Sequence, residues 1–254
     1  MSQTKQLQVW ADSFKEGEWF LINLAQNYYK NSFDVKYKFN FQPIITFYQD
    51  GGILFEAIVF APYRNWSPIP SPVRKILEYG KPDVILYDPD VNQVFFAVEE
   101  TAAVPTGNQS LQRLERVCFA AEQGIPFVYL VSEYGLHIDG HVRRSSIWPS
   151  YLALKLTSQY QVISLTLLYG DAQHPEDYNI GTGVHDLAEI SDVIIKEWLG
   201  ESVEERKRML LKKIIRKMCD FILDQYWEIS PHLPGRNLLS KDEFHEALVQ
   251  RVIP

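Results

Sequence analysis

The sequence predicts a mixed α/β fold, in which a mixed β-sheet is flanked by helices and followed by a helical C-terminal region. Three observations support this prediction. Residues 81–131 alternate between β-rich and helical segments, further β-rich segments lie on both sides of them, and from Ala188 onward apolar residues recur at helical spacing. We expect the 254 residues to divide into a core at 1–187 and a helical region at 188–254 that packs on this core.

The central stretch reads as strand, turn, strand, loop, helix and strand. Val84–Tyr87 and Gln93–Thr101 are rich in β-branched and aromatic residues, and the Asp, Pro and Asn residues between them favour a turn. After a loop at 102–108, Gln109–Gln123 carries apolar residues at helical spacing and ends before Gly124. Ile125–Val131 is a wholly apolar strand of the kind that is buried within a sheet.

Earlier segments are expected to extend the sheet. Trp10–Tyr29 has an amphipathic helical pattern, and Lys30–Asn40 alternates lysines with aromatic residues as a strand with one wet face would. Ile44–Tyr48 and Ile53–Phe60 flank an Asp-Gly turn and predict a hairpin. A helix at Pro72–Tyr79 follows, because Ser71 can cap it and a proline suits its first turn.

Later segments complete the predicted sheet and then become helical. Leu136–Val142 contains another Asp-Gly hairpin signal, Pro149–Ser158 is expected to be a short helix and Gln161–Tyr169 a strand. A long polar loop is expected at Gly170–Asp186. The predicted C-terminal helices are Ile190–Leu199, Glu201–Ile229 and Ser240–Val252, the last opened by a Ser240–Glu243 capping box.

The composition says more about the cellular compartment of the protein than about its activity. The formal net charge of −7 is unlike the basic balance of proteins that coat nucleic acid, but a nuclease can carry a basic cleft on an acidic body. The two cysteines, Cys118 and Cys219, are interpreted as core residues in a reducing compartment. No segment approaches the roughly 20 apolar residues of a membrane span, and no signal peptide is found. We expect a cytoplasmic protein without a membrane partner.

Folding alone does not explain three acidic residues on the central strands, because burying a carboxylate costs free energy. Asp83 precedes the first strand, and Glu99 and Glu100 lie side by side near the end of the second. A carboxylate on an otherwise apolar hairpin loses hydration unless another group compensates it. A hard divalent cation with oxygen ligands would do so, and Asp83 and Glu99 lie on adjacent strands.

The two glutamates are expected on opposite faces of the sheet, since strand side chains alternate. Glu99 would share one face with Phe95 and Thr101, whereas Glu100 would share the other with Val94. The alternative interpretation is that these acids are solvated at a sheet end and serve no site.

The order Pro82-Asp83, then Glu99-x-Thr101, then a helix and a strand resembles the PD-(D/E)xK nuclease superfamily, which includes many type II restriction endonucleases. The segment from Pro105 to Arg116 also resembles restriction-type members. By matching position, the resemblance implies that Asp83 and Glu99 bind Mg²⁺ and that the fold is restriction-endonuclease-like. Thr101 departs from the pattern, because the family's lysine usually stands there.

The resemblance leaves two assignments open. Four residues are candidates to share the role of the missing lysine: Lys81, Gln109, Gln112 and Arg113. Restriction-type nucleases often take one more carboxylate from an upstream element, and both Glu56 and Glu78 are candidates for it.

Candidate DNA contacts lie outside the acidic pair. Arg64 occurs beside Trp66 in a proline-rich loop, and Gln112 and Arg113 follow the acidic strand. Lys207 and Lys213 belong to the chain's one strongly basic run, which is either a phosphate-contacting surface or a solvated helix face. The alternating lysines and aromatics near Lys36 could also meet phosphates and bases.

The expected function is Mg²⁺-dependent hydrolysis of double-stranded DNA by a sequence-specific endonuclease of the type II restriction kind, acting as a homodimer. The rival is a catalytically degenerate protein of the same fold that binds DNA or a protein partner without cleavage. A third hypothesis is an unrelated α/β protein in which Pro82-Asp83 is incidental.

Overall fold

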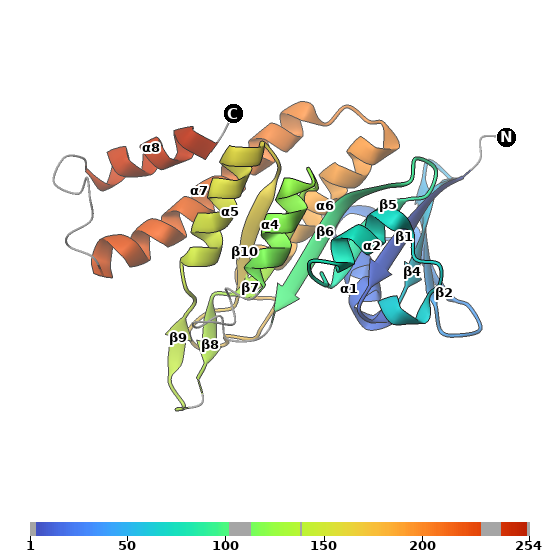
Figure 1. The fold of residues 1–254 in the computed structure, drawn as a ribbon, viewed down its shortest axis with the longest axis horizontal. Helices are drawn as coiled ribbons and strands as arrows, with labels where there is room; N and C mark the ends of the chain where they lie inside the picture. The colour runs from blue at the N-terminus through green and yellow to red at the C-terminus, as the bar shows by residue number, and fades with distance from the viewer. Residues whose placement is uncertain (1–3, 102–112, 138, 230–239, 253–254) are drawn as a thin grey trace.

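The structure, a computed structural model, describes residues 4–101, 113–137, 139–229 and 240–252 (Figure 1). Its centre is an eight-stranded mixed sheet in the order β10-β7-β6-β5-β1-β4-β3-β2. The strands are β1 (Lys5–Ala11), β2 (Phe33–Tyr37), β3 (Pro43–Gln49), β4 (Gly52–Phe60), β5 (Val84–Asp88), β6 (Gln93–Thr101), β7 (Phe127–Ser132) and β10 (Ser164–Tyr169).

Strand β1 joins two halves of this sheet. It pairs in parallel with β4 and antiparallel with β5, so Val9 lies between Val59 and Leu86. On one side, β3 and β2 extend the sheet as antiparallel neighbours. On the other side, β6 pairs antiparallel with β5, and β7 and β10 follow in parallel.

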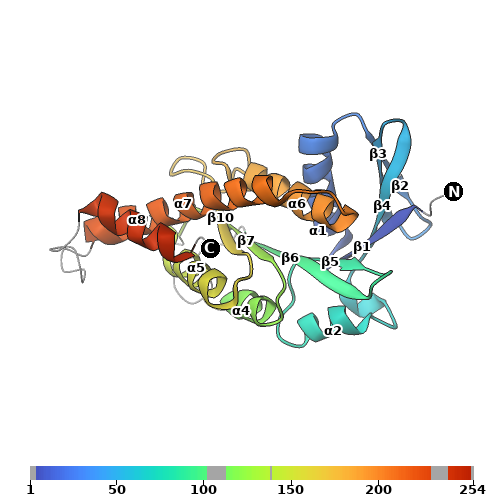
Figure 2. The same ribbon diagram turned by 90° about the horizontal axis from the view of Figure 1, so that it is seen from above.

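Helices cover both faces of the sheet. Figure 2 shows α1, α6 and α7 on one face and α2 and α4 on the other. The helices are α1 (Phe14–Leu24), α2 (Ser71–Leu77), α4 (Leu114–Glu122), α5 (Trp148–Tyr160), α6 (Gly183–Leu199), α7 (Glu204–Ile229) and α8 (Lys241–Val252), with a π-helical turn at Ala25–Tyr29 and a 3-10 turn at Tyr63–Asn65. A separate hairpin consists of β8 (Tyr134–Leu136) and β9 (Val142–Arg144).

Two apolar clusters account for this arrangement. Phe20, Phe96 and Ile190 belong to the cluster beneath α1, α6 and α7. Val117 and Phe127 belong to the cluster beneath α2 and α4. The predicted fold class is confirmed: a mixed α/β protein with flanking helices and a helical C-terminal region. The expected boundary at 187/188 falls inside α6, because that helix already begins at Gly183.

The N-terminal prediction was wrong in one respect. Trp10 belongs to strand β1 and not to a helix, because the helix begins only at Phe14. The hydroxyl of Ser13 accepts the N–H of Glu16 at 3.2 Å and so caps the helix there. The segment before this cap is extended and buries Leu7 and Val9 at the centre of the sheet.

The central stretch follows the prediction closely, with one exception. The pairing register shifts between Leu86 and Tyr87 on β5, so Phe95 on β6 is an extra, unpaired residue that forms a β-bulge. Phe95 therefore packs on the same face as Phe96, whereas Val94 joins the opposite cluster. Beyond this bulge, the predicted alternation of Glu99 and Glu100 holds.

Several other predictions are confirmed. The hairpin at β3 and β4, the strand β10 and the hairpin at β8 and β9 all form as expected. The predicted capping box is present at α8, where the Ser240 hydroxyl accepts the N–H of Glu243 and the Glu243 carboxylate accepts the N–H of Ser240. No helix in the described part of the chain is both long and apolar enough to cross a membrane.

Candidate active site

The register of β5 and β6 brings the two predicted ligands together. Val84 pairs with Val98 in this antiparallel ladder, so the next positions outward, Asp83 and Glu99, face each other. Asp83 is held from the neighbouring strand as well, because its carbonyl accepts the N–H of Asp12 at 3.2 Å. The two carboxylates therefore lie on one face of the sheet, at the C-terminal end of β6.

Glu99 is fully buried between two arginines. Arg113 donates to its Oε1 at 2.6 Å, and Arg116 donates to its Oε2 at 2.5 Å. Arg113 also donates to the carbonyl of Glu100 at 2.9 Å. Burial raises the pKa of Glu99, and the guanidinium groups of Arg116 and Arg113 oppose this rise. A Cβ at position 80 would collide with the side chain of Arg116, so Gly80 leaves space for this arginine.

Asp83 has no such compensation. Its Oδ2 accepts the N–H of Glu100 at 2.6 Å, but no cation of the described residues lies within ion-pair distance of it. Burial, followed by the negative charge of Glu99, raises the pKa of Asp83 from 3.8 to about 8. At neutral pH this carboxyl group is therefore mostly protonated in the metal-free protein.

The opposite face of β6 is closed by aromatic residues. Tyr178 donates to Oε1 of Glu100, and its ring stacks on Tyr169 at 4.3 Å between centroids. The hydroxyl of Tyr169 donates to the carbonyl of Thr101 at 3.0 Å. Burial raises the pKa of Glu100, and the hydrogen bond from Tyr178 partly offsets the rise. These contacts fix the end of strand β6.

Glu16 supplies a third carboxylate that the sequence analysis did not select. Its negative charge contributes to the raised pKa values of both Asp83 and Glu100, which places it beside the acidic pair. Its Oε2 is buried and has no hydrogen-bond partner in the described structure. The cap of α1 positions this side chain, since Ser13 fixes the first turn of the helix next to β1.

The two acids proposed from sequence for this role lie elsewhere. Glu56 pairs with Gln6 across β4 and β1, so it lies about 20 Å along the strand from Asp12 and its neighbour Asp83. Its Oε1 accepts the hydroxyl of Thr46 at 3.4 Å. Glu78 is exposed at the C-terminal end of α2. Neither is among the charges that shift the pKa of Asp83.

The position of the family's lysine is buried. Thr101 is 4% exposed, and the guanidinium groups of Arg113 and Arg116 bind Glu99, two residues before it on β6. Of the proposed substitutes for the lysine, Arg113 contacts Glu99 directly and Lys81 is exposed two residues before Asp83. Gln109 and Gln112 lie outside the described residues.

The predicted DNA contacts fall into two groups. Arg64 is exposed in the loop after β4, and no carboxylate of the described residues pairs with it. Lys207 and Lys213 are on α7, where Lys207 pairs with Glu197 at 2.7 Å and Lys213 with Glu189 at 2.9 Å. The carboxylates of α6 therefore neutralise much of the basic run.

Sequence reasoning missed three further groups at the site: Glu16, Arg116 and Tyr129. Tyr129 lies beside Glu99 on β7, and its buried hydroxyl has no hydrogen-bond partner in the described structure. Arg113 lies at the N-cap of α4 and Arg116 in its first turn, and this spacing of three residues places their side chains on one side of the helix start. That spacing was a usable signal, whereas Glu16 and Tyr129 reach the site only through the pairing of distant strands.

The donors suit Mg²⁺ in kind. Asp83 and Glu99 offer hard carboxylate oxygens, and Mg²⁺ is usually bound by one or two carboxylates together with waters and substrate phosphates. The unpartnered oxygen of Glu16 and the raised pKa of Asp83 both indicate carboxyl groups whose ionised form a bound cation would stabilise. Among the described side chains, no group of three or more His, Cys, Asp or Glu residues is gathered closely enough to hold a metal ion unaided.

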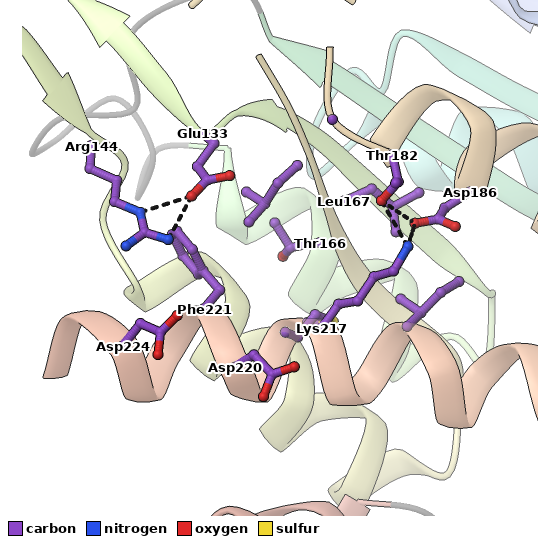
Figure 3. A pocket seen from close by; sticks show the side chains of 14 residues that line it. Glu133, Arg144, Thr166, Leu167, Thr182, Asp186, Lys217, Asp220, Phe221 and Asp224 are labelled. Atoms are coloured by element: carbon purple, nitrogen blue, oxygen red, sulfur yellow. Dashed lines mark hydrogen bonds and ion pairs between the residues drawn. The ribbon is translucent and has the colours of Figure 1, made fainter. Parts of the chain in front are cut away.

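A cavity of about 320 Å³ lies away from these acids. It is formed between β10, α6, α7 and the hairpin of β8 and β9, and Figure 3 shows Glu133 and Arg144 on one side of it and Lys217 and Asp186 on the other. None of the acidic residues at the end of β6 lines it. This cavity is therefore distinct from the candidate active site.

Comparisons with protein-family models, with curated proteins and with solved structures find no match for this chain. The resemblance to the PD-(D/E)xK superfamily therefore rests on the chain's own residues. These are Asp83 and Glu99 facing each other at the end of a strand pair, followed by a helix and a parallel strand.

Proposed function

We propose that this protein is a Mg²⁺-dependent endodeoxyribonuclease of the PD-(D/E)xK type. One observation carries the proposal: the register of β5 and β6 sets Asp83 opposite Glu99, and partial burial together with the negative charge of Glu99 raises the pKa of Asp83 to about 8. Folding alone does not favour such a group, since an apolar or amide side chain would cost less. Groups with strongly shifted pKa values are common at functional sites.

Asp83 and Glu99 would hold the ion, which would polarise the scissile phosphate and lower the pKa of a bound water. Asp83 would lose its proton as a cation arrives, because the positive charge favours the carboxylate. Arg113 and Arg116 orient Glu99 through both of its oxygens. They also provide positive charge beside the acidic pair, which is what the family's lysine would otherwise supply near Thr101.

The restriction-type features extend this proposal. Sequence-specific cleavage of a palindromic site requires a two-fold dimer, because each subunit then cuts one strand. Light scattering with and without DNA measures this directly. A protein that remains monomeric on its cleaved substrate would contradict the dimer and leave the nuclease activity itself in place.

The first test is incubation with long duplex DNA of varied sequence, with Mg²⁺ or with EDTA, and with a matching RNA in parallel. We expect discrete DNA fragments only with Mg²⁺. Asp83→Asn should reduce the cleavage rate at least about a thousandfold, since a lost metal ligand removes several kcal/mol of transition-state stabilisation. Glu56→Gln is the matched control, because this strand carboxylate lies at the far end of the sheet and should be dispensable.

Full activity of Asp83→Asn, or equal losses in Asp83→Asn and Glu56→Gln, would contradict the assignment of the site. Cleavage of RNA in preference to DNA would contradict the proposed substrate. Thermal unfolding of each variant shows whether a loss of activity is a loss of folding.

A second function has specific support. Thr101 is buried in place of a lysine, and both oxygens of Glu99 are bound by arginines. These features suit a catalytically degenerate protein that binds DNA without cutting it. If the native chain binds DNA but is inert, and Thr101→Lys acquires Mg²⁺-dependent cleavage, this second function is supported and the first is not.

A further inference from the structure

The connection between β2 and β3 exposes an unusual run of aromatic side chains. Tyr37, Phe39 and Phe41 are 57%, 105% and 79% exposed, and Lys36 and Lys38 alternate with them. We call residues 36–41 the aromatic tip. Large apolar side chains are commonly exposed singly, but a contiguous group marks a surface that binds something.

The aromatic tip is a turn whose backbone is fixed by hydrogen bonds. Lys38 donates its N–H to the carbonyl of Gln42 at 3.0 Å, and Phe41 donates its N–H to the carbonyl of Lys38 at 2.9 Å. The buried side chain of Gln42 donates to the carbonyl of Val59 at 2.9 Å and so anchors the turn to β4. These hydrogen bonds fix the backbone of the turn, and the side chains of Phe39 and Phe41 project from it into solvent.

Strand directions place the aromatic tip and the acidic site at the same end of the strands. Ile44, just after the tip, pairs with Ile58 near the C-terminal end of β4. That end runs parallel to the end of β1, which lies beside Val84. In Figure 1 the β2–β3 connection, the end of β6 and the β8–β9 hairpin all lie on the lower side of the molecule. Four strand spacings separate the tip from the Asp83–Glu99 pair, or about 19 Å.

The charge of the aromatic tip also differs from that of the other basic regions. Lys36 and Lys38 are exposed, and no carboxylate of the described residues forms an ion pair with either. Arg143, on the β8–β9 hairpin, is instead paired with Asp139 at 2.5 Å. The two lysines are therefore free to meet the phosphates of a nucleic acid.

We propose that the aromatic tip is a DNA-binding arm, in which Phe39 and Phe41 stack on bases while Lys36 and Lys38 contact phosphates. Its link to catalysis rests on the proposed function: the same DNA would run past the ends of the strands to Asp83 and Glu99. The separation of about 19 Å corresponds to about five or six base pairs of duplex. Aromatic rings with interleaved cations are a general means of holding nucleic acid.

The test measures DNA binding in EDTA, so that it does not depend on cleavage. Fluorescence anisotropy would follow a 30-mer as a duplex and as a single strand. The double variant Phe39→Ala/Phe41→Ala should weaken binding at least about tenfold, as expected for the loss of base stacking. The double variant Ile53→Ala/Val91→Ala is the matched control, because it removes exposed apolar side chains from the opposite end of the sheet and should bind normally.

Two signatures separate stacking and phosphate contact from a general surface effect. A 2-aminopurine base in the oligonucleotide should be quenched by the native protein and not by Phe39→Ala/Phe41→Ala. Lys36→Ala/Lys38→Ala should reduce the slope of log affinity against log salt by about two, since each phosphate contact contributes about one.

Unchanged affinity and quenching in Phe39→Ala/Phe41→Ala would overturn the arm, even if the protein cleaves DNA. Binding of native protein to phosphatidylserine vesicles, but not to either oligonucleotide, would overturn it in favour of a membrane surface. A loss of binding in the tip variants of a protein that never cleaves DNA would support the arm while refuting the proposed nuclease.

Discussion

Asp83 and Asp186 are both aspartates packed against a sheet end, yet their surroundings differ. Asp186, in the first turn of α6, pairs with Lys217 at 2.6 Å and Lys213 at 3.1 Å and accepts the Thr182 hydroxyl at 2.9 Å. Figure 3 shows the Lys217, Thr182 and Asp186 contacts beside the cavity. Burial acts to raise the pKa of Asp186, but the hydrogen bonds from Lys217 and Lys213 outweigh it and lower the pKa overall.

The difference separates a carboxylate that holds the fold together from one that opposes it. Asp186 joins α6 to α7 and meets its cations within the chain. Asp83 meets an N–H and the negative charges of Glu99, Glu16 and Glu100, and the pKa of its carboxyl rises instead. A partly buried carboxylate that forms no ion pair within the chain would be stabilised in its ionised form by a cation from outside. This contrast can be broken or sharpened by substitution.

The largest effect is expected at Asp83. Its raised pKa means that the folded state keeps a proton that the unfolded state releases above about pH 4, so the free energy of unfolding falls as the pH rises from about 4 to about 8. Asp83→Asn has no such proton to lose. Between pH 4 and pH 8 the native protein should therefore lose on the order of 3–5 kcal/mol more unfolding free energy than the variant does. Urea unfolding of both proteins at the two pH values measures it.

If Asp83→Asn and the native chain lose stability in parallel between pH 4 and pH 8, the carboxyl is not buried without compensation. Mg²⁺ supplies an independent check, because it should stabilise the native protein at pH 8 and leave Asp83→Asn unaffected.

An intermediate effect of the opposite sign is expected at Lys217. Lys217→Met keeps the aliphatic packing but removes a cation from Asp186, and it should lower the free energy of unfolding at pH 7 by about 1–2 kcal/mol, since the lysine is partly exposed. Because the pKa of Asp186 is lowered, the stabilisation exists above pH 3.8 and is lost as the pH falls through the folded value.

Lys212→Met is the matched control on the same helix, since Lys212 is exposed. A loss of stability in Lys212→Met as large as that in Lys217→Met would show that helix charge, and not the ion pair, is responsible.

The smallest effect is expected at Glu16. Glu16→Gln removes one of the acids near Asp83 and should lower the pKa of Asp83 by less than about one unit, because burial and Glu99 make larger contributions. The ¹³C carboxyl resonance of Asp83, followed against pH, reports this value. Glu18→Gln, two residues along α1, is the control, since Glu18 accepts a hydrogen bond from Tyr37. An equal shift in both variants would place Glu16 outside the site.

Local sequence patterns predicted the part of the site that local structure forms. The strand pair that carries Asp83 and Glu99, and the helix and strand that follow, depend on turn residues and apolar periodicity within one stretch. The bulge at Phe95 could not be predicted in this way, because it is set by how β6 meets β5. The Phe95 and Val94 faces were therefore assigned wrongly.

The rest of the site depends on contacts that no local pattern encodes. Glu16 fits a capping box with Ser13, so its spacing indicates a helix start, and only the placement of β1 beside β5 brings it to Asp83. Tyr178 comes from the polar loop before α6 and reaches Glu100 from far along the chain. The choice between Glu56 and Glu78 failed for the same reason, since both were judged by sequence neighbourhood.

The position of β1 has a consequence for how the protein assembles. This strand precedes both of its partners in the chain, so β4 and β5 must be synthesised before it can pair on both sides. Such distant pairing slows folding, because chain entropy is lost before the contacts form. A deletion or an inserted peptide within Lys5–Ala11 would therefore divide the sheet at its centre.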